Sequence, residues 1–258
     1  MEAAEAGQVN TESRVVVEAC VDAIDAALEA ELGGASRLEL CGELLQGGVT
    51  PSAGLIAAVW ERIDIPLFVL VRPRTGDFLY SDDELDVMRR DIEQVKALGA
   101  EGIALGALTA DGDVDVGRLG PLVELARPML VTFHRAFDLV REQASALDAL
   151  IALGIDRVLT SGGAPTAAAG IAAIASLVQR AGHRTIVMAG GSITASNVGD
   201  IGAATGVREV HVRGAARVTS AMRHRREVVS LSRAGGSEYE RSVTRAEEMR
   251  RVVGRVAE

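Results

Sequence analysis

Short apolar segments recur along the chain, and each is followed by a helical pattern of apolar and polar residues. The segments are rich in Val, Ile and Leu, and successive ones start 22 to 35 residues apart, about the length of one strand–helix unit. We predict eight strands, at Val15–Cys20, Arg37–Cys41, Leu67–Arg72, Gly102–Gly106, Met129–His134, Arg157–Thr160, Thr185–Ala189 and Glu209–Val212. Eight such units are typical of a (β/α)8, or TIM, barrel. A doubly wound parallel sheet is the alternative, although it usually has fewer strands and leaves open edges.

Short motifs mark the limits of the helices between these strands. Ser81 and Glu84 have the spacing of a capping box, in which the serine hydroxyl accepts a backbone N–H and the glutamate reaches back to the cap. Gly33, Gly99 and Gly154 each precede a predicted strand, and we expect each to end a helix in the left-handed conformation.

The strand–helix rhythm stops after the eighth strand. We therefore divide the chain into a flexible tail (1–13), one barrel domain (14–217) and a C-terminal extension (218–258) with one amphipathic helix over Val243–Val256. The extension either wraps back to supply the eighth helix of the barrel or joins another subunit. Its amphipathic stretch leads us to expect a homo-oligomer.

Polar residues gather where the predicted strands end, which is where TIM barrels build their active sites. Glu18, Glu39, Arg72, His134 and His211 lie within apolar segments, and burying such groups is costly unless they are paired or bind a ligand. Glu39 and Arg72, on neighbouring strands, could also form a purely structural ion pair. The acid–base candidates are Glu18, Glu39, Asp77 and His134, and the ligand-binding candidates are Arg72, Arg74, Arg135, Asp138, Ser161, Gly162, Gly190, Gly191 and His211.

This set suits a small anionic ligand. Arginine offers paired donors to carboxylate and phosphate groups, and the glycines after the sixth and seventh strands allow backbone N–H groups to approach an anion. The glycines serve equally well in plain tight turns. Lys96 is the only lysine and falls in a predicted helix, which excludes an aldolase that forms a Schiff base at a strand end.

The two cysteines suggest a second chemistry. Cys20 and Cys41 end neighbouring predicted strands with the same parity, so we expect their Cβ atoms about 5 Å apart. Two such thiolates suit Cu(I), because soft sulfur ligands select it. Buried cysteines also commonly serve as small apolar fillers. Zinc is less favoured, since the chain has no Cys-x-x-Cys motif.

Composition narrows the class of protein. The chain has 258 residues, is 48% hydrophobic and carries a net charge of −9, which argues against nucleic-acid binding because that requires a basic surface. No apolar run approaches the roughly 18 residues that a membrane span requires, and the first residues do not have the pattern of a secretory signal. Two cysteines are too few for a disulfide framework. We expect a soluble cytoplasmic protein without an organic cofactor.

Several longer motifs resemble the copper homeostasis protein CutC family. They are Val17–Val21, Arg37–Cys41, Gly47–Ser52, Arg72–Phe78, Thr132–Asp138, Leu159–Gly163 and Met188–Gly191, and the resemblance runs from about Arg14 to Arg217. It implies a TIM barrel, a cytoplasmic oligomer and a role in copper handling. It also implies that Cys20 and Cys41 are the copper ligands.

Two functions follow from these observations. The first is a copper homeostasis protein that binds Cu(I) through Cys20 and Cys41. The alternative is an enzyme that acts on a small phosphorylated or carboxylated substrate by general acid–base chemistry. A purely structural module fits poorly with so many charged residues at one end of a barrel.

Overall fold

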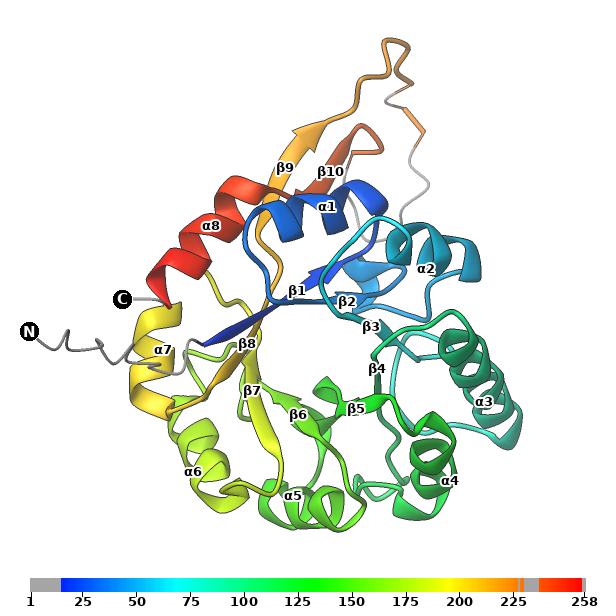
Figure 1. Cartoon of the computed structure of the whole chain (residues 1–258), viewed down its shortest axis with the longest axis vertical. Coiled ribbons are helices and arrows are strands. Elements are labelled where there is room, and N and C mark those ends of the chain that lie inside the picture. Colours follow the sequence, from blue (N-terminus) through cyan, green and yellow to red (C-terminus); the bar gives the residue numbers. More distant parts are fainter. Residues whose placement is uncertain (1–14, 227, 230–236, 257–258) are drawn as a thin grey trace, which may run out of the picture.

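The computed structural model describes residues 15–226, 228–229 and 237–256. Eight parallel strands form a closed barrel in sequence order, with β8 hydrogen-bonded back to β1 (Figure 1). The strands are β1 (Val16–Val21), β2 (Arg37–Leu40), β3 (Leu67–Leu70), β4 (Gly102–Leu105), β5 (Leu130–Phe133), β6 (Arg157–Thr160), β7 (Ile186–Gly190) and β8 (Glu209–Val212). This confirms the predicted TIM barrel and excludes the doubly wound sheet, which has open edges.

Helices surround the barrel (Figure 1). They are α1 (Ile24–Leu32), α2 (Ala53–Trp60), α3 (Asp82–Ala97), α4 (Val116–Ala126), α5 (Gln143–Ala152), α6 (Ile171–Ala181), α7 (Val198–Thr205) and α8 (Ala246–Arg255), with short 3-10 turns η1 (Leu44–Gln46) and η2 (Arg135–Leu139). All the helices in the described ranges fall short of the length and apolar character that a bilayer span requires.

Side chains alternate between the two faces of each strand. On β2, Leu38 and Leu40 are fully buried in the apolar layer between barrel and helices, whereas Arg37 and Glu39 contact residues of other strands inside the barrel. Because successive side chains of a strand point to opposite faces, apolar strands can carry charged groups into the barrel without disturbing the outer layer.

The helix limits follow local rules with one exception. Both hydrogen bonds of the capping box between Ser81 and Glu84 are present. Gly99 and Gly154 have the expected left-handed φ, +88° and +76°. The prediction for Gly33 is wrong: its φ is −80°, because its N–H still closes the last turn of α1, and Gly34 takes the left-handed conformation instead.

The C-terminal extension supplies the last helix of the ring. Strands β9 (Ala215–Thr219) and β10 (Glu240–Thr244) form an antiparallel ribbon, after which α8 packs between α7 and α1 (Figure 1). The predicted amphipathic helix over Val243–Val256 is too long at its start. Val243 and Thr244 complete β10, and the helix begins at Ala246.

The apolar face of α8 is covered by its own chain. Met249, Val252 and Val253 are buried in the main hydrophobic cluster of the barrel, and the Glu29 carboxylate accepts the Ala246 N–H at 2.7 Å. The amphipathic pattern is thus explained within one chain, and it no longer supports contact with another subunit.

A tight contact at Gly33 fixes the position of α8, so we expect Gly33→Ala to weaken the fold. A Cβ at this position would lie 2.4 Å from Met249 Cβ and 2.9 Å from the Ala246 carbonyl oxygen. Such overpacking costs about 1–3 kcal/mol, measurable as a lower urea midpoint. Gly202→Ala in α7, where a Cβ has no neighbour within 4 Å, is the matched control and should stabilise by up to about 1 kcal/mol. Equal midpoints for the two variants would contradict this packing argument.

Candidate functional site

A cavity of about 530 Å³ opens at the carboxyl ends of the barrel strands. Side chains from β1, β2, β3, β6 and β8, and from the loops after β2, β3, β5, β7 and β8, line it. The structure brings eight of the predicted site residues into the lining: Cys20, Glu39, Cys41, Arg72, His134, Arg135, Gly191 and His211.

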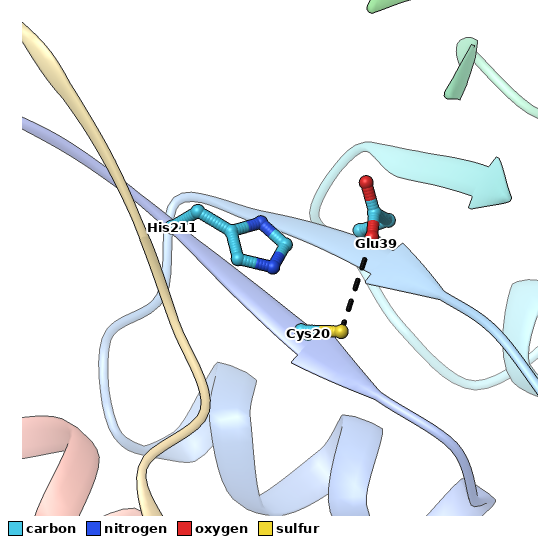
Figure 2. Close-up of side chains that lie close together, drawn as sticks. All are labelled: Cys20, Glu39 and His211. Atoms are coloured by element: carbon cyan, nitrogen blue, oxygen red, sulfur yellow. Dashed lines mark hydrogen bonds between the residues drawn. The ribbon is translucent and has the colours of Figure 1, made fainter. Parts of the chain in front are cut away.

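The two cysteines meet on the wall formed by β1 and β2. Cys20 pairs with Glu39 in the strand register, and Cys41 follows two residues later on the same face. The two Sγ atoms are 3.9 Å apart, both cysteines are free, and Cys41 is fully buried. The Cys20 thiol also points toward Glu39, with 3.9 Å between Sγ and Oε1 (Figure 2).

An imidazole from β8 completes this group. Figure 2 shows His211 turned toward Cys20 and Glu39, and one potential ligand atom from each of the three residues lies within 4.8 Å of the others. His211 Nδ1 lies 2.8 Å from Glu18 Oε1, which fixes the orientation of the ring. The two thiols and the imidazole are donors that fit a soft metal ion, whereas the carboxyl of Glu39 is a hard oxygen donor.

Burial and close neighbours shift the pKa values in this group. The Cys41 thiol and burial raise the pKa of Cys20 well above its ordinary value, so this thiol is protonated at neutral pH. Burial raises the pKa of Glu39 to about 7. Burial opposes the protonation of His211, but Glu39 and Glu18 outweigh it and raise the pKa of this residue. A metal that binds Cys20 must therefore displace the proton of this thiol.

A chain of buried ion pairs lies beneath the cavity. Arg37 Nε contacts Glu18 Oε2 at 2.5 Å, and Arg37 Nη2 contacts Glu209 Oε2 at 2.6 Å. Arg157 Nε binds the same Glu209 oxygen at 2.8 Å. Although burial opposes ionisation, the hydrogen bond from His211 and the charge of Arg37 lower the pKa of Glu18 to about 2. Glu18 is thus an ionised member of this chain.

Three members of this chain are not among the site residues predicted from the sequence. Arg37, Arg157 and Glu209 are the first residues of their strands, whereas the predicted residues lie toward the carboxyl ends. A usable signal was present, because Arg37 and Glu209 each stand two positions before a candidate, Glu39 and His211, and therefore face the same side of their strands.

Arg72 is a buried cation whose contacts are with backbone carbonyls. Its Nη1 donates to the carbonyl oxygens of Gly47 at 3.2 Å and Gly48 at 2.8 Å, and its Nη2 donates to that of Gly76 at 2.7 Å. The guanidinium lies over the Phe78 ring, 4.8 Å from its centroid. Among the described residues no carboxylate lies within 4.0 Å of Arg72, so the structural ion pair with Glu39 that the sequence allowed does not form.

His134 presents an unpartnered donor. Its Nδ1 accepts the Ala136 N–H at 3.2 Å, which places the proton of the neutral ring on Nε2. Nε2 is buried and has no hydrogen-bond partner in the described part of the chain. Burial and the nearby Arg72 charge lower the pKa of His134 to about 3, so the ring is neutral at physiological pH.

Asp138 organises the loop after β6. Its carboxylate accepts hydrogen bonds from Thr160 Oγ1 at 2.6 Å, from the backbone N–H groups of Ser161 at 2.9 Å and Gly163 at 3.0 Å, and from Arg135 Nε at 2.7 Å. Its oxygens are engaged by this loop, and Asp138 lies outside the cavity lining.

The structure leaves seven of the predicted site residues outside the lining: Glu18, Arg74, Asp77, Asp138, Ser161, Gly162 and Gly190. Arg74 binds Asp77 at 2.9 Å and Glu84 at 2.5 Å, which ties the loop after β3 to the start of α3. The side chains of a loop do not obey strand parity, so the sequence could not separate Arg74, which points away, from Arg72, which lines the cavity.

Two polar lining residues were absent from the predicted set. Ser192 follows β7 and has a φ of +56°, a left-handed conformation that is uncommon for serine and is found more often at functional sites. Arg213 follows β8, and its guanidinium contacts the Ser242 carbonyl oxygen at 3.5 Å. The place of Arg213 directly after a strand was the signal that could have identified it.

Comparison with known proteins identifies the family. The profile of the CutC family matches residues 15–216. The chain belongs to the CutC family. A CutC family protein of Chromobacterium violaceum is 46% identical over 235 residues, which cover 91% of this chain and 95% of the relative.

Other members of the CutC family resemble the chain over most of its length. The copper homeostasis protein cutC homolog of Mus musculus is 44% identical over 239 residues, which cover 92% of this chain and 88% of the relative. The crystal structure of CutC from Streptococcus agalactiae is similar with a TM-score of 0.74 and 33% identity, covering 77% of this chain and 98% of that one. These matches confirm the resemblance found in the sequence motifs.

The buried ion pairs predict a large loss of stability for Arg37→Met. The substitution leaves the Glu18 and Glu209 carboxylates buried without their shared cation, which costs about 3–5 kcal/mol of unfolding free energy. Arg180→Met is the matched control, because Arg180 forms an exposed ion pair with Asp148 that is worth less than about 1 kcal/mol. Denaturant titration of both variants measures the difference. Similar losses in the two variants would show that the inner ion pairs are not needed for stability.

The lowered pKa of His134 predicts that this residue makes the fold less stable in acid. The ordinary pKa of histidine, about 6.5, applies to the unfolded chain, whereas the folded pKa is about 3. The unfolded state therefore binds more protons between these values, and this residue lowers stability as pH falls from 6.5 toward 3, by up to about 1.4 kcal/mol per pH unit. We expect His134→Gln to give a shallower slope of unfolding free energy between pH 6 and 4.5. His183→Gln, at an exposed position, should keep the wild-type slope, and an unchanged slope in His134→Gln would contradict the assignment.

Proposed function

We propose that this protein is a copper homeostasis protein that binds Cu(I) through Cys20 and Cys41. The observation that carries the proposal is the separation of 3.9 Å between the two Sγ atoms. Bonds between a metal ion and thiolate sulfur are about 2.3 Å long in zinc sites, so a single ion can reach both sulfurs at a similar distance. Soft thiolates favour Cu(I), and the copper homeostasis name of the mouse relative supports the same metal.

The surroundings of the sulfurs favour a site of this kind. Cys20 and Cys41 pack with Leu70 and Ala104 in a small apolar cluster inside the barrel. The open side of the pair faces the cavity, where His211 offers an imidazole. When bound, copper would be the cargo of this site, and the residues that hold it would be the two cysteines, with His211 as a further donor.

We also propose a cytoplasmic location and a homo-oligomer. Both cysteines are free, as is usual in a reducing compartment. The homo-oligomer is implied by the family resemblance.

The test is an anaerobic titration of the reduced protein with Cu(I) against a chromogenic chelator. We expect the wild type to retain one equivalent per chain and the Cys20→Ser/Cys41→Ser variant to retain none, because the hydroxyl is a poor ligand for a soft ion. Met222→Ser removes an exposed sulfur outside the cavity and is the matched control. Equal copper retention in the wild type and the double variant would overturn the proposal, as would tighter binding of Zn²⁺ than of Cu(I).

The second candidate is an enzyme that acts on a small phosphorylated or carboxylated substrate. It is favoured by the size of the cavity, about 530 Å³, which is in the range of small-molecule sites, and by the Arg72 cation in its wall. In this function Arg72 would hold the anionic group and Glu39 would exchange protons with the substrate. Lys96 lies in α3 and donates to the carbonyl oxygens of Leu125 and Arg127, so it takes no part.

A further inference from the structure

The cavity combines two chemically different walls. One wall carries the sulfur pair, and the other carries Arg72 and the unpartnered Nε2 of His134. Gly48 joins them: its carbonyl oxygen accepts from Arg72 at 2.8 Å, and a Cβ at this glycine would lie 3.5 Å from Cys41 Sγ. A single molecule in the cavity can therefore touch both walls.

The size of the cavity excludes a bare metal ion as its full occupant. An ion held by Cys20 and Cys41 would fill only a small part of about 530 Å³, a volume within the usual range for sites that bind small molecules. The cavity therefore has room for a ligand that carries further atoms around or beside the metal.

The cations in the cavity lining that have no carboxylate partner determine the chemistry of that ligand. Arg135 already pairs with Asp138, but among the described residues no carboxylate lies within 4.0 Å of Arg72 or of Arg213. Arg72 is only 6% exposed, and a buried guanidinium without a counter-ion is unfavourable. A ligand carboxylate would supply the missing charge, and His134 Nε2 would donate a further hydrogen bond to it.

We propose that copper reaches the sulfur pair as an anionic complex, in which Cu(I) is held by two molecules of a low-molecular-weight thiol that also carries carboxylates. This inference rests on the proposed copper function. One carboxylate binds at Arg72 and His134 and another at Arg213, while the metal faces Cys20 and Cys41. Copper then passes by ligand exchange: two Cu–S bonds to the carrier break, two Cu–S bonds to the protein form, and the two cysteine protons move to the departing thiolates. Copper stays in the Cu(I) state, so no oxidant or reductant is needed.

The test compares two copper donors under anaerobic conditions. Glutathione supplies a thiol with carboxylates, and dithiothreitol supplies a thiol without them. Timed quenching with a chelator measures how fast copper is transferred from each Cu(I) complex to the protein. The decisive quantity is the ratio of the two rates, glutathione over dithiothreitol, because its change between variants does not depend on the intrinsic lability of either donor.

We expect Arg72→Gln to lower this ratio about 10-fold or more, which is the scale of a lost hydrogen bond to a charged group. Arg72→Lys should recover part of the ratio because it keeps the charge. Arg213→Gln should lower the ratio independently, and this side chain does not hold the loops that Arg72 supports. Arg180→Gln should leave the ratio unchanged, because Arg180 lies on α6 and outside the cavity lining. S-methylglutathione, which has no thiol for copper, should slow transfer from the glutathione complex more than transfer from the dithiothreitol complex.

Two results would overturn the inference while leaving the copper function intact. One is an unchanged ratio in both Arg72→Gln and Arg213→Gln, and the other is the absence of any competition by S-methylglutathione. A failure of both donors to load the wild type would instead overturn the copper function itself, and the inference with it.

Discussion

The barrel closes around a chain of buried charges that alternates between cations and carboxylates. His211, Glu18, Arg37, Glu209 and Arg157 connect β8, β1, β2 and β6 across the interior, with contacts of 2.5 to 2.8 Å. Each carboxylate lies between two cationic or hydrogen-bonding partners, which offsets the cost of removing it from water. Both guanidinium groups also lie over Phe68, 4.9 and 5.2 Å from the ring centroid.

The arrangement of the cavity lining depends on these buried ion pairs. Glu18 is fully engaged below the cavity and orients His211, so the imidazole is held beside Cys20. Glu39 is left without a cation within 4.0 Å in the described structure, and burial keeps its pKa near 7. The sulfurs lie on the segment formed by β1 and β2, and Arg72 follows the neighbouring strand β3, so soft ligands and a buried cation line the same cavity.

Arg72 has a second role, because it supports the loops that shape the mouth. Its three hydrogen bonds to carbonyl oxygens join the segment after β2 to the segment after β3. Carbonyl oxygens satisfy the N–H groups of a guanidinium but leave its charge without a counter-ion. The outer ring is completed from the other end of the chain, where α8 fills the place between α7 and α1. The closed ring keeps β8 and β1 together, and these strands carry His211 and Cys20.

The sequence by itself determined the eight strands, the barrel and the closeness of the Cys20 and Cys41 side chains. These follow from local rules: the length of a strand–helix unit and the alternation of side chains along a strand both act over a few residues. Only the tertiary structure decided which charges are paired, that Arg72 lines the cavity while Arg74 turns away, and that α8 packs on Gly33. Those outcomes depend on residues that are far apart in the chain, such as Arg37 and Glu209 or Gly33 and Met249. Closure of the barrel brings them together, and no local pattern encodes their distance.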